Sequence, residues 1–73
     1  MALEKIEAPL PGKILRVNIK PGDKISEFDE VCVIEAMKME NPIVSTVSGT
    51  AKEVLVSVGK VVKVGEVLAI IEY

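Results

Sequence analysis

The chain has 73 residues, a net charge of −2 and 49% hydrophobic residues, which suits one small domain with a modest core. One phenylalanine, one tyrosine and no basic cluster exclude a nucleic-acid surface built from phosphate contacts and stacked bases. Histidine is absent and no phosphate-binding glycine loop is present, so we predict no catalytic residue and no metal site.

The sequence carries no signal for export or for membrane insertion. Its N-terminus lacks a basic-then-apolar signal pattern, and no apolar run is long enough to span a bilayer. The single cysteine, Cys32, lies between Val31 and Val33 and is predicted to be a buried filler rather than a reactive thiol. We therefore expect a soluble protein of a reducing compartment, the cytoplasm or, in a eukaryote, the mitochondrial matrix.

The first half of the chain is predicted to form short strands. In residues 14–19, apolar and polar side chains alternate, with Leu15, Val17 and Ile19 apolar, as in a half-buried strand. The sequence Pro-Gly-Asp at residues 21–23 then predicts a turn. Residues 31–36 form a compact apolar run, which is typical of a strand in a sandwich core.

Residues 35–40 read Glu-Ala-Met-Lys-Met-Glu and separate two apolar runs. Strands are usually left through glycine, asparagine, aspartate or proline, and this stretch contains none of them. A hairpin tip is nevertheless predicted here, with Met37 and Met39 in a position that normally faces water. Folding does not require that arrangement, so recognition by another protein is the favoured interpretation.

The second half repeats the first. A shift of 37 positions aligns residues 8–36 with residues 45–73 without a gap. The identical pairs are Gly12 and Gly49, Val17 and Val54, Gly22 and Gly59, Ile34 and Ile71, and Glu35 and Glu72. We interpret the repeated glycines as marking the same turns twice. The prediction is an all-β fold of eight short strands in two packed sheets, with approximate two-fold symmetry.

The symmetry places Lys38 on a hairpin that the second half lacks, because the corresponding point there is the chain end at Tyr73. An exposed amine at a hairpin tip suits acylation by a separate enzyme. The plain alternative is that Met37 and Met39 fill gaps in the core while Lys38 merely points outward. The other seven lysines are interpreted as solvated charges.

The hexapeptide Glu35–Glu40 resembles the biotin attachment motif of biotinyl domains, the biotin carboxyl carrier family of biotin-dependent carboxylases and decarboxylases. The resemblance extends from Ile6–Gly12 to the last strand. It implies that residues 1–73 are one biotinyl domain, a non-catalytic carrier. It also implies a flattened β-barrel of two four-stranded antiparallel sheets, related by a pseudo-two-fold axis, with the target lysine on a β-hairpin tip.

By the same resemblance, Lys38 would carry biotin in amide linkage, attached by a biotin protein ligase that uses biotinyl-adenylate. Glu35 would help to position the target for modification. Recognition by the ligase or a later partner would involve Glu35, Ala36, Met37, Met39 and Glu40. The attached biotin would then move between a biotin carboxylase and a carboxyltransferase or decarboxylase, at the high effective concentration that a tether provides.

The sequence departs from the family at Phe28, where glycine is common and where the second repeat has Gly65. Phenylalanine adopts a positive φ with difficulty, so the turn around Phe28 is predicted either to differ or to be strained. The repeat without gaps also leaves no room for the protruding thumb of the bacterial acetyl-CoA carboxylase carrier. The chain therefore resembles the thumbless carriers of propionyl-CoA, pyruvate and oxaloacetate systems.

Two other functions stay open. A lipoyl domain has the same fold and a swinging lysine, but its tip typically reads Asp-Lys-Ala, whereas Met37 and Met39 flank the lysine here. An unmodified interaction domain, in which the methionine tip simply docks on a partner, belongs to a different class. Replacing Lys38 by arginine separates these cases, because docking would survive and a carrier would lose its function.

Overall fold

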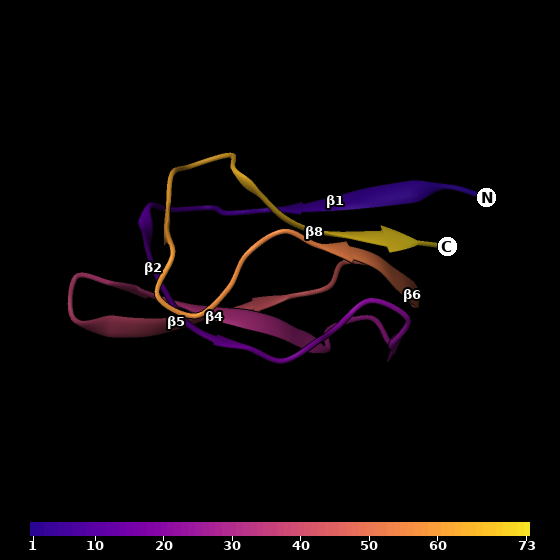
Figure 1. Cartoon of the computed structure of the whole chain (residues 1–73), viewed down its shortest axis with the longest axis horizontal. Helices are drawn as coiled ribbons and strands as arrows, with labels where there is room; N and C mark the ends of the chain where they lie inside the picture. Colours follow the sequence, from indigo (N-terminus) through magenta and orange to yellow (C-terminus); the bar gives the residue numbers. More distant parts are fainter.

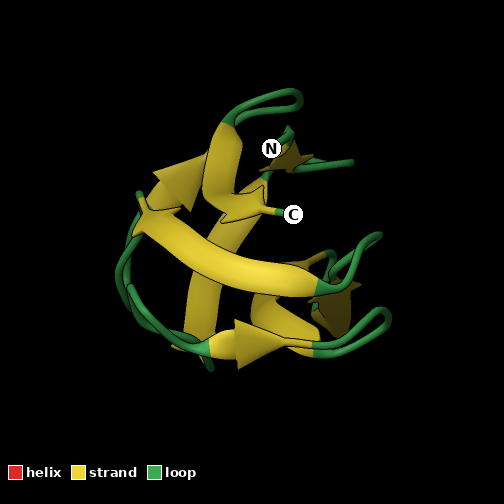
Figure 2. Ribbon diagram, turned by 90° about the vertical axis from the view of Figure 1, so that its right-hand side faces the viewer, coloured by secondary structure: helices red, strands yellow, loops and turns green.

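The computed structural model describes residues 1–73 and contains eight β-strands and no helix (Figure 2). The strands are β1 (Leu3–Glu7), β2 (Gly12–Val17), β3 (Lys24–Ile25), β4 (Glu30–Ala36), β5 (Met39–Val44), β6 (Gly49–Val54), β7 (Val61–Val62) and β8 (Val67–Glu72). The all-β prediction is confirmed. No helix that could cross a membrane is found.

The strands form two four-stranded antiparallel sheets, with the orders β1-β8-β6-β3 and β5-β4-β2-β7. A shift of 37 residues places β2, β3 and β4 on β6, β7 and β8, so the two orders correspond and the predicted two-fold symmetry is present. The molecule is elongated, 36 × 18 × 17 Å. Both termini lie at one end, and the β4–β5 hairpin lies at the opposite end (Figure 1).

The core lies between the sheets and is made of aliphatic side chains from both. Ile14 and Ile34 come from one sheet and Leu68 and Ile71 from the other, and none of the four is exposed. The predicted strand at residues 14–19 is displaced, because β2 ends at Val17. A β-bulge between Ile14 and Arg16 breaks the simple alternation, and the bulge turns Ile14 fully into the core while leaving Leu15 half-buried.

Cys32 has the structural role expected of it. Its side chain is completely buried in the core on β4. Burial, followed by the nearby Glu30 carboxylate, raises the pKa of the Cys32 thiol to about 11, so the thiolate is scarce at neutral pH.

The repeated glycines serve two different purposes. Gly22 and Gly59 both have a φ of 94° and sit in matching turns, as predicted. Gly12 and Gly49 instead begin strands β2 and β6, so the interpretation of all repeated glycines as turn markers is wrong for this pair. A Cβ at Gly12 would overlap the Glu35 carbonyl oxygen, and a Cβ at Gly49 would overlap that of Glu72. These two glycines therefore permit a close approach of backbones.

Phe28 adopts the backbone conformation of a glycine. Its φ is 73°, against 84° for Gly65 at the equivalent position. Both turns make the same backbone hydrogen bond, from Phe28 N to Ser45 O and from Gly65 N to Ala8 O, each at 2.8 Å. The ring itself is 72% exposed, so it packs on little of the protein. Of the two predicted outcomes, a different turn is excluded, and the positive φ at a bulky residue favours the strained turn.

We expect the Phe28→Gly variant to be more stable than the wild type. Removing the left-handed strain of a bulky residue raises the free energy of unfolding by about 1–2 kcal/mol. Glycine has more conformational freedom in the unfolded chain, which cancels part of that increase. The net gain should be about 1 kcal/mol, seen as a higher midpoint in urea unfolding with an unchanged slope. A Gly65→Phe variant serves as the matched control and should lose stability. An unchanged or lower midpoint for Phe28→Gly would show that the turn is not strained.

Candidate functional site

The hairpin that joins β4 to β5 turns in only two residues. Ala36 pairs with Met39, and Met37 and Lys38 form the turn between them with φ angles of 53° and 63°. Two successive positive φ values are characteristic of a type I′ turn, which is normally built from Asn-Gly. A non-glycine residue in this region costs about 1–2 kcal/mol. The tip thus retains two strained residues where a more stable turn was available.

The side chains at the tip point into solvent. Met37 is 93% exposed and Met39 is 66% exposed, so neither methionine fills a gap in the core and the plain alternative fails. Lys38 is exposed and takes part in neither of the two ion pairs of the protein. Its amine is therefore free to enter the active site of another protein, with an apolar side chain on either side of it.

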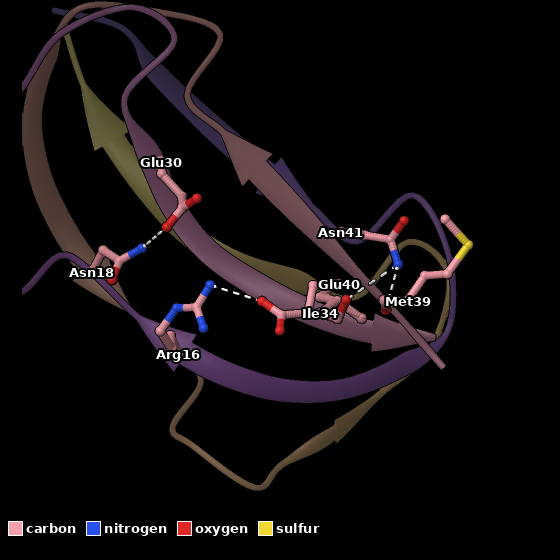
Figure 3. Close-up of polar contacts among 7 residues, drawn as sticks. All are labelled: Arg16, Asn18, Glu30, Ile34, Met39, Glu40 and Asn41. Carbon is pink, nitrogen blue, oxygen red and sulfur yellow. Dashed lines mark hydrogen bonds and ion pairs between the residues drawn. The ribbon is translucent and has the colours of Figure 1, made fainter. Parts of the chain in front are cut away.

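The carboxylates of the hexapeptide lie on the outer face of the sheet, just behind the tip. Glu35 is exposed and pairs across the strands with Glu40 on one side and Lys13 on the other. Like charges in directly opposite positions repel each other. Arg16 relieves that repulsion by donating a hydrogen bond to Glu40 at 3.0 Å within an ion pair (Figure 3). Both partners are more than half exposed, so the pair contributes at most about 1 kcal/mol.

Asn41 holds the base of the hairpin together. Its half-buried side-chain amide donates to the carbonyl oxygens of Ile34 and Met39, at 3.3 and 3.2 Å (Figure 3). It thereby bonds the backbones of β4 and β5 immediately behind the strained turn. Sequence reasoning missed both Asn41 and Arg16. The signal for Asn41 was a polar residue at a core-facing position, since Ile43 two residues later is buried.

We expect the Asn41→Ala variant to lose about 1–2 kcal/mol of stability, because two hydrogen bonds disappear and two carbonyl groups lose a partner. The effect should concentrate at the tip. Amide hydrogen exchange of residues 36–40 should accelerate more than exchange in β6 or β8. An Asn18→Ala variant, which removes an exposed amide elsewhere, is the control and should leave the tip unchanged. Uniform acceleration across the chain would contradict a local role for Asn41.

These features define a class: a small all-β domain that presents one lysine, outside any ion pair, on an exposed hairpin. The family described as "Biotin-requiring enzyme" matches residues 4–71. The chain therefore belongs to that family, which confirms the family resemblance drawn from the sequence. Its cofactor is biotin, and its role is that of a biotin carrier.

Known proteins with similar sequences or structures support the assignment to this family. The mitochondrial propionyl-CoA carboxylase alpha chain of Homo sapiens is 42% identical over 67 residues, which are 92% of this chain and 9% of that protein. The biotin carboxyl carrier protein of Streptococcus mutans is 43% identical over 65 residues, 89% of this chain and 50% of that protein. The Kluyveromyces lactis urea carboxylase has a TM-score of 0.91 at 29% identity, covering 99% of this chain and 6% of that one.

This chain thus spans half or less of the length of these relatives.

Proposed function

We propose that Lys38 is the attachment site of biotin, and that residues 1–73 act as one non-catalytic domain carrying a carboxyl group between two enzymes. The observation that carries this proposal is the free Lys38 amine on a strained, exposed turn between two methionines. The fit to biotin is chemical: the cofactor has a carboxylate that forms an amide with a primary amine, and Lys38 offers an exposed amine that takes part in neither ion pair of the protein.

The chain contributes positioning to the attachment reaction. A biotin protein ligase would split ATP into AMP and pyrophosphate to activate the biotin carboxylate. The neutral Lys38 amine then attacks the activated carbonyl carbon, the amide C–N bond forms, AMP leaves and the nitrogen loses a proton. Glu35 would orient the tip for this step, while Ala36, Met37, Met39 and Glu40 contact the ligase or a later partner. Ala36 is small and half-buried, so it lets the ligase approach the turn closely.

Once attached, biotin supplies a ring nitrogen that accepts and releases a carboxyl group. The proposed partners are a biotin carboxylase, which loads the carboxyl group, and a carboxyltransferase or decarboxylase, which removes it. The hairpin lies at the end of the molecule away from both termini (Figure 1). A segment attached at either terminus would therefore leave the tip free to reach the active sites of both partner enzymes. The buried, lone Cys32 suits a reducing compartment, the cytoplasm or the mitochondrial matrix.

Parallel incubation with a biotin protein ligase and with a lipoate ligase tests this proposal. Intact mass should rise by one biotinyl group with the first enzyme and stay unchanged with the second. A gain of one lipoyl group alone would assign the chain to lipoyl transfer. No gain from correctly folded protein with either ligase would favour an unmodified docking domain.

A further inference from the structure

The side chain of Asn41 bonds to the hairpin at two points close to its tip. Met39 is the first residue after the turn, and Ile34 lies directly across from Asn41 on β4. The amide nitrogen donates to the carbonyl oxygens of both residues, at 3.2 and 3.3 Å, while the amide oxygen points away from them (Figure 3). The hairpin therefore uses only the donating half of the amide.

The fold does not require an amide at this position. A shift of 37 residues places β1 on β5, and the equivalent of Asn41 in the first half is Glu4. The Glu4 carboxylate cannot donate to a carbonyl group, and it accepts a hydrogen bond from Thr46 instead. The pairing of β1 with β8 thus forms without such a link. The asparagine is confined to the strand that follows Lys38.

The tip of the hairpin has little else to hold it closed. Because β5 is the edge strand of its sheet, the hairpin is paired on one side only. The turn between Ala36 and Met39 consists of Met37 and Lys38, which both have a positive φ although neither is glycine. Strained residues persist only where the surrounding structure fixes them. A strained, exposed turn on an edge strand belongs to the parts of a fold that open most easily.

An open tip would serve neither of the proposed enzymes. Lys38 is the second residue of the turn, so the direction of its side chain depends on the backbone angles that Asn41 supports. A partner that accepts only the closed turn binds the chain more weakly in proportion to the fraction of tips that are open. Opening would therefore raise the KM of each enzyme for the chain. The chemical step starts from the bound, closed turn and would keep its rate.

We propose that Asn41 is a positioning residue, which keeps the turn of Met37 and Lys38 closed for the biotin protein ligase and for the biotin carboxylase alike. This inference rests on the function proposed for Lys38. Asn41 acts through the hairpin backbone and not through contact with either enzyme. Its loss should therefore affect two unrelated enzymes equally, whereas a residue that contacts one enzyme would affect that enzyme alone.

The variants Asn41→Ala and Gly22→Ala, compared as substrates, test this role. Gly22→Ala is the matched control, because its φ of 94° also makes alanine costly while its N–H bonds to Ala51 in the other sheet. With ATP and biotin saturating, we expect Asn41→Ala to raise the KM of the ligase three- to tenfold, with kcat within twofold. After complete biotinylation, the KM of the biotin carboxylase should rise by the same factor. Gly22→Ala should match the wild type with both enzymes.

The variant Asn41→Asp removes the donor while keeping the shape of the side chain. It places a carboxylate opposite two carbonyl oxygens, and β1 already accepts an acidic residue at the equivalent position. Thermal unfolding should show it as folded, and its KM should exceed that of Asn41→Ala with both enzymes.

Three results would overturn the positioning role: an unchanged KM with both enzymes, a raised KM with one enzyme only, or an equal rise in Gly22→Ala. The second would make Asn41 a contact residue, and the third would reduce its effect to general stability. Failure of the wild type to take up biotin would overturn the proposed function instead.

Discussion

The Lys38→Arg variant will take up no biotin from a biotin protein ligase, whereas the wild type will gain one biotinyl group. Arginine keeps the positive charge, the length and the exposure of the side chain. Its guanidinium stays protonated at any working pH and offers no nucleophilic nitrogen. We expect a loss of labelling of at least a thousandfold, measured by intact mass after the wild type has reacted completely.

The control for this variant is Lys52→Arg, which changes another exposed lysine in the opposite sheet. It should be labelled at the wild-type rate. Thermal unfolding of Lys38→Arg should be nearly unchanged, because Lys38 makes no ion pair and both residues would meet the same positive φ. Labelling that persists in Lys38→Arg would mean that another lysine is the attachment site.

The Gly12→Ala variant should lose about 3 kcal/mol of stability. The new methyl carbon would lie 2.5 Å from Ile34 Cγ2 and would overlap the Glu35 carbonyl oxygen, so β2 and β4 must separate. Overpacking of this kind typically costs 1–3 kcal/mol, and more where backbone atoms must move. The free energy of unfolding of a chain of this length is about 4–11 kcal/mol in total. The midpoint of thermal unfolding should therefore fall by more than about 10 °C.

Gly22→Ala separates crowding from backbone strain. No atom lies within 4 Å of a Cβ built at Gly22, although its φ is also unsuited to alanine. Its cost should be limited to the backbone term, about 1 kcal/mol. If both variants lost the same amount, the close approach of β2 to Glu35 would not be the reason for Gly12.

The parts of the fold that are local or repeated could be predicted from the sequence. The 37-residue repeat indicated eight strands in two sheets, and the turn at Gly22 and Gly59 followed from glycine chemistry. The bulge between Ile14 and Arg16 could not be predicted, because it depends on the register between β2 and β4. Gly12 resembled a turn residue for the same reason: the backbone that it approaches is distant in sequence.

The site shows the same division. Lys38 and its methionines were found because their residue types conflict with a turn, and that conflict is visible in the sequence alone. Arg16 and Asn41 were missed, since their partners Glu40 and Ile34 become neighbours only when β2, β4 and β5 pair. Phe28 could be predicted only in part. Its poor fit to a turn was predictable, but only the structure shows that the turn keeps the glycine geometry.

The most direct test of the carrier role is the transfer of a labelled carboxyl group. The biotinylated chain is incubated with a biotin carboxylase, ATP and labelled bicarbonate, with free biotin as a separate substrate to show that the enzyme is active. We predict one label on each biotinylated chain and none on the Lys38→Arg variant treated in the same way. Labelling of free biotin without labelling of the biotinylated chain would contradict a carboxyl carrier built around Lys38.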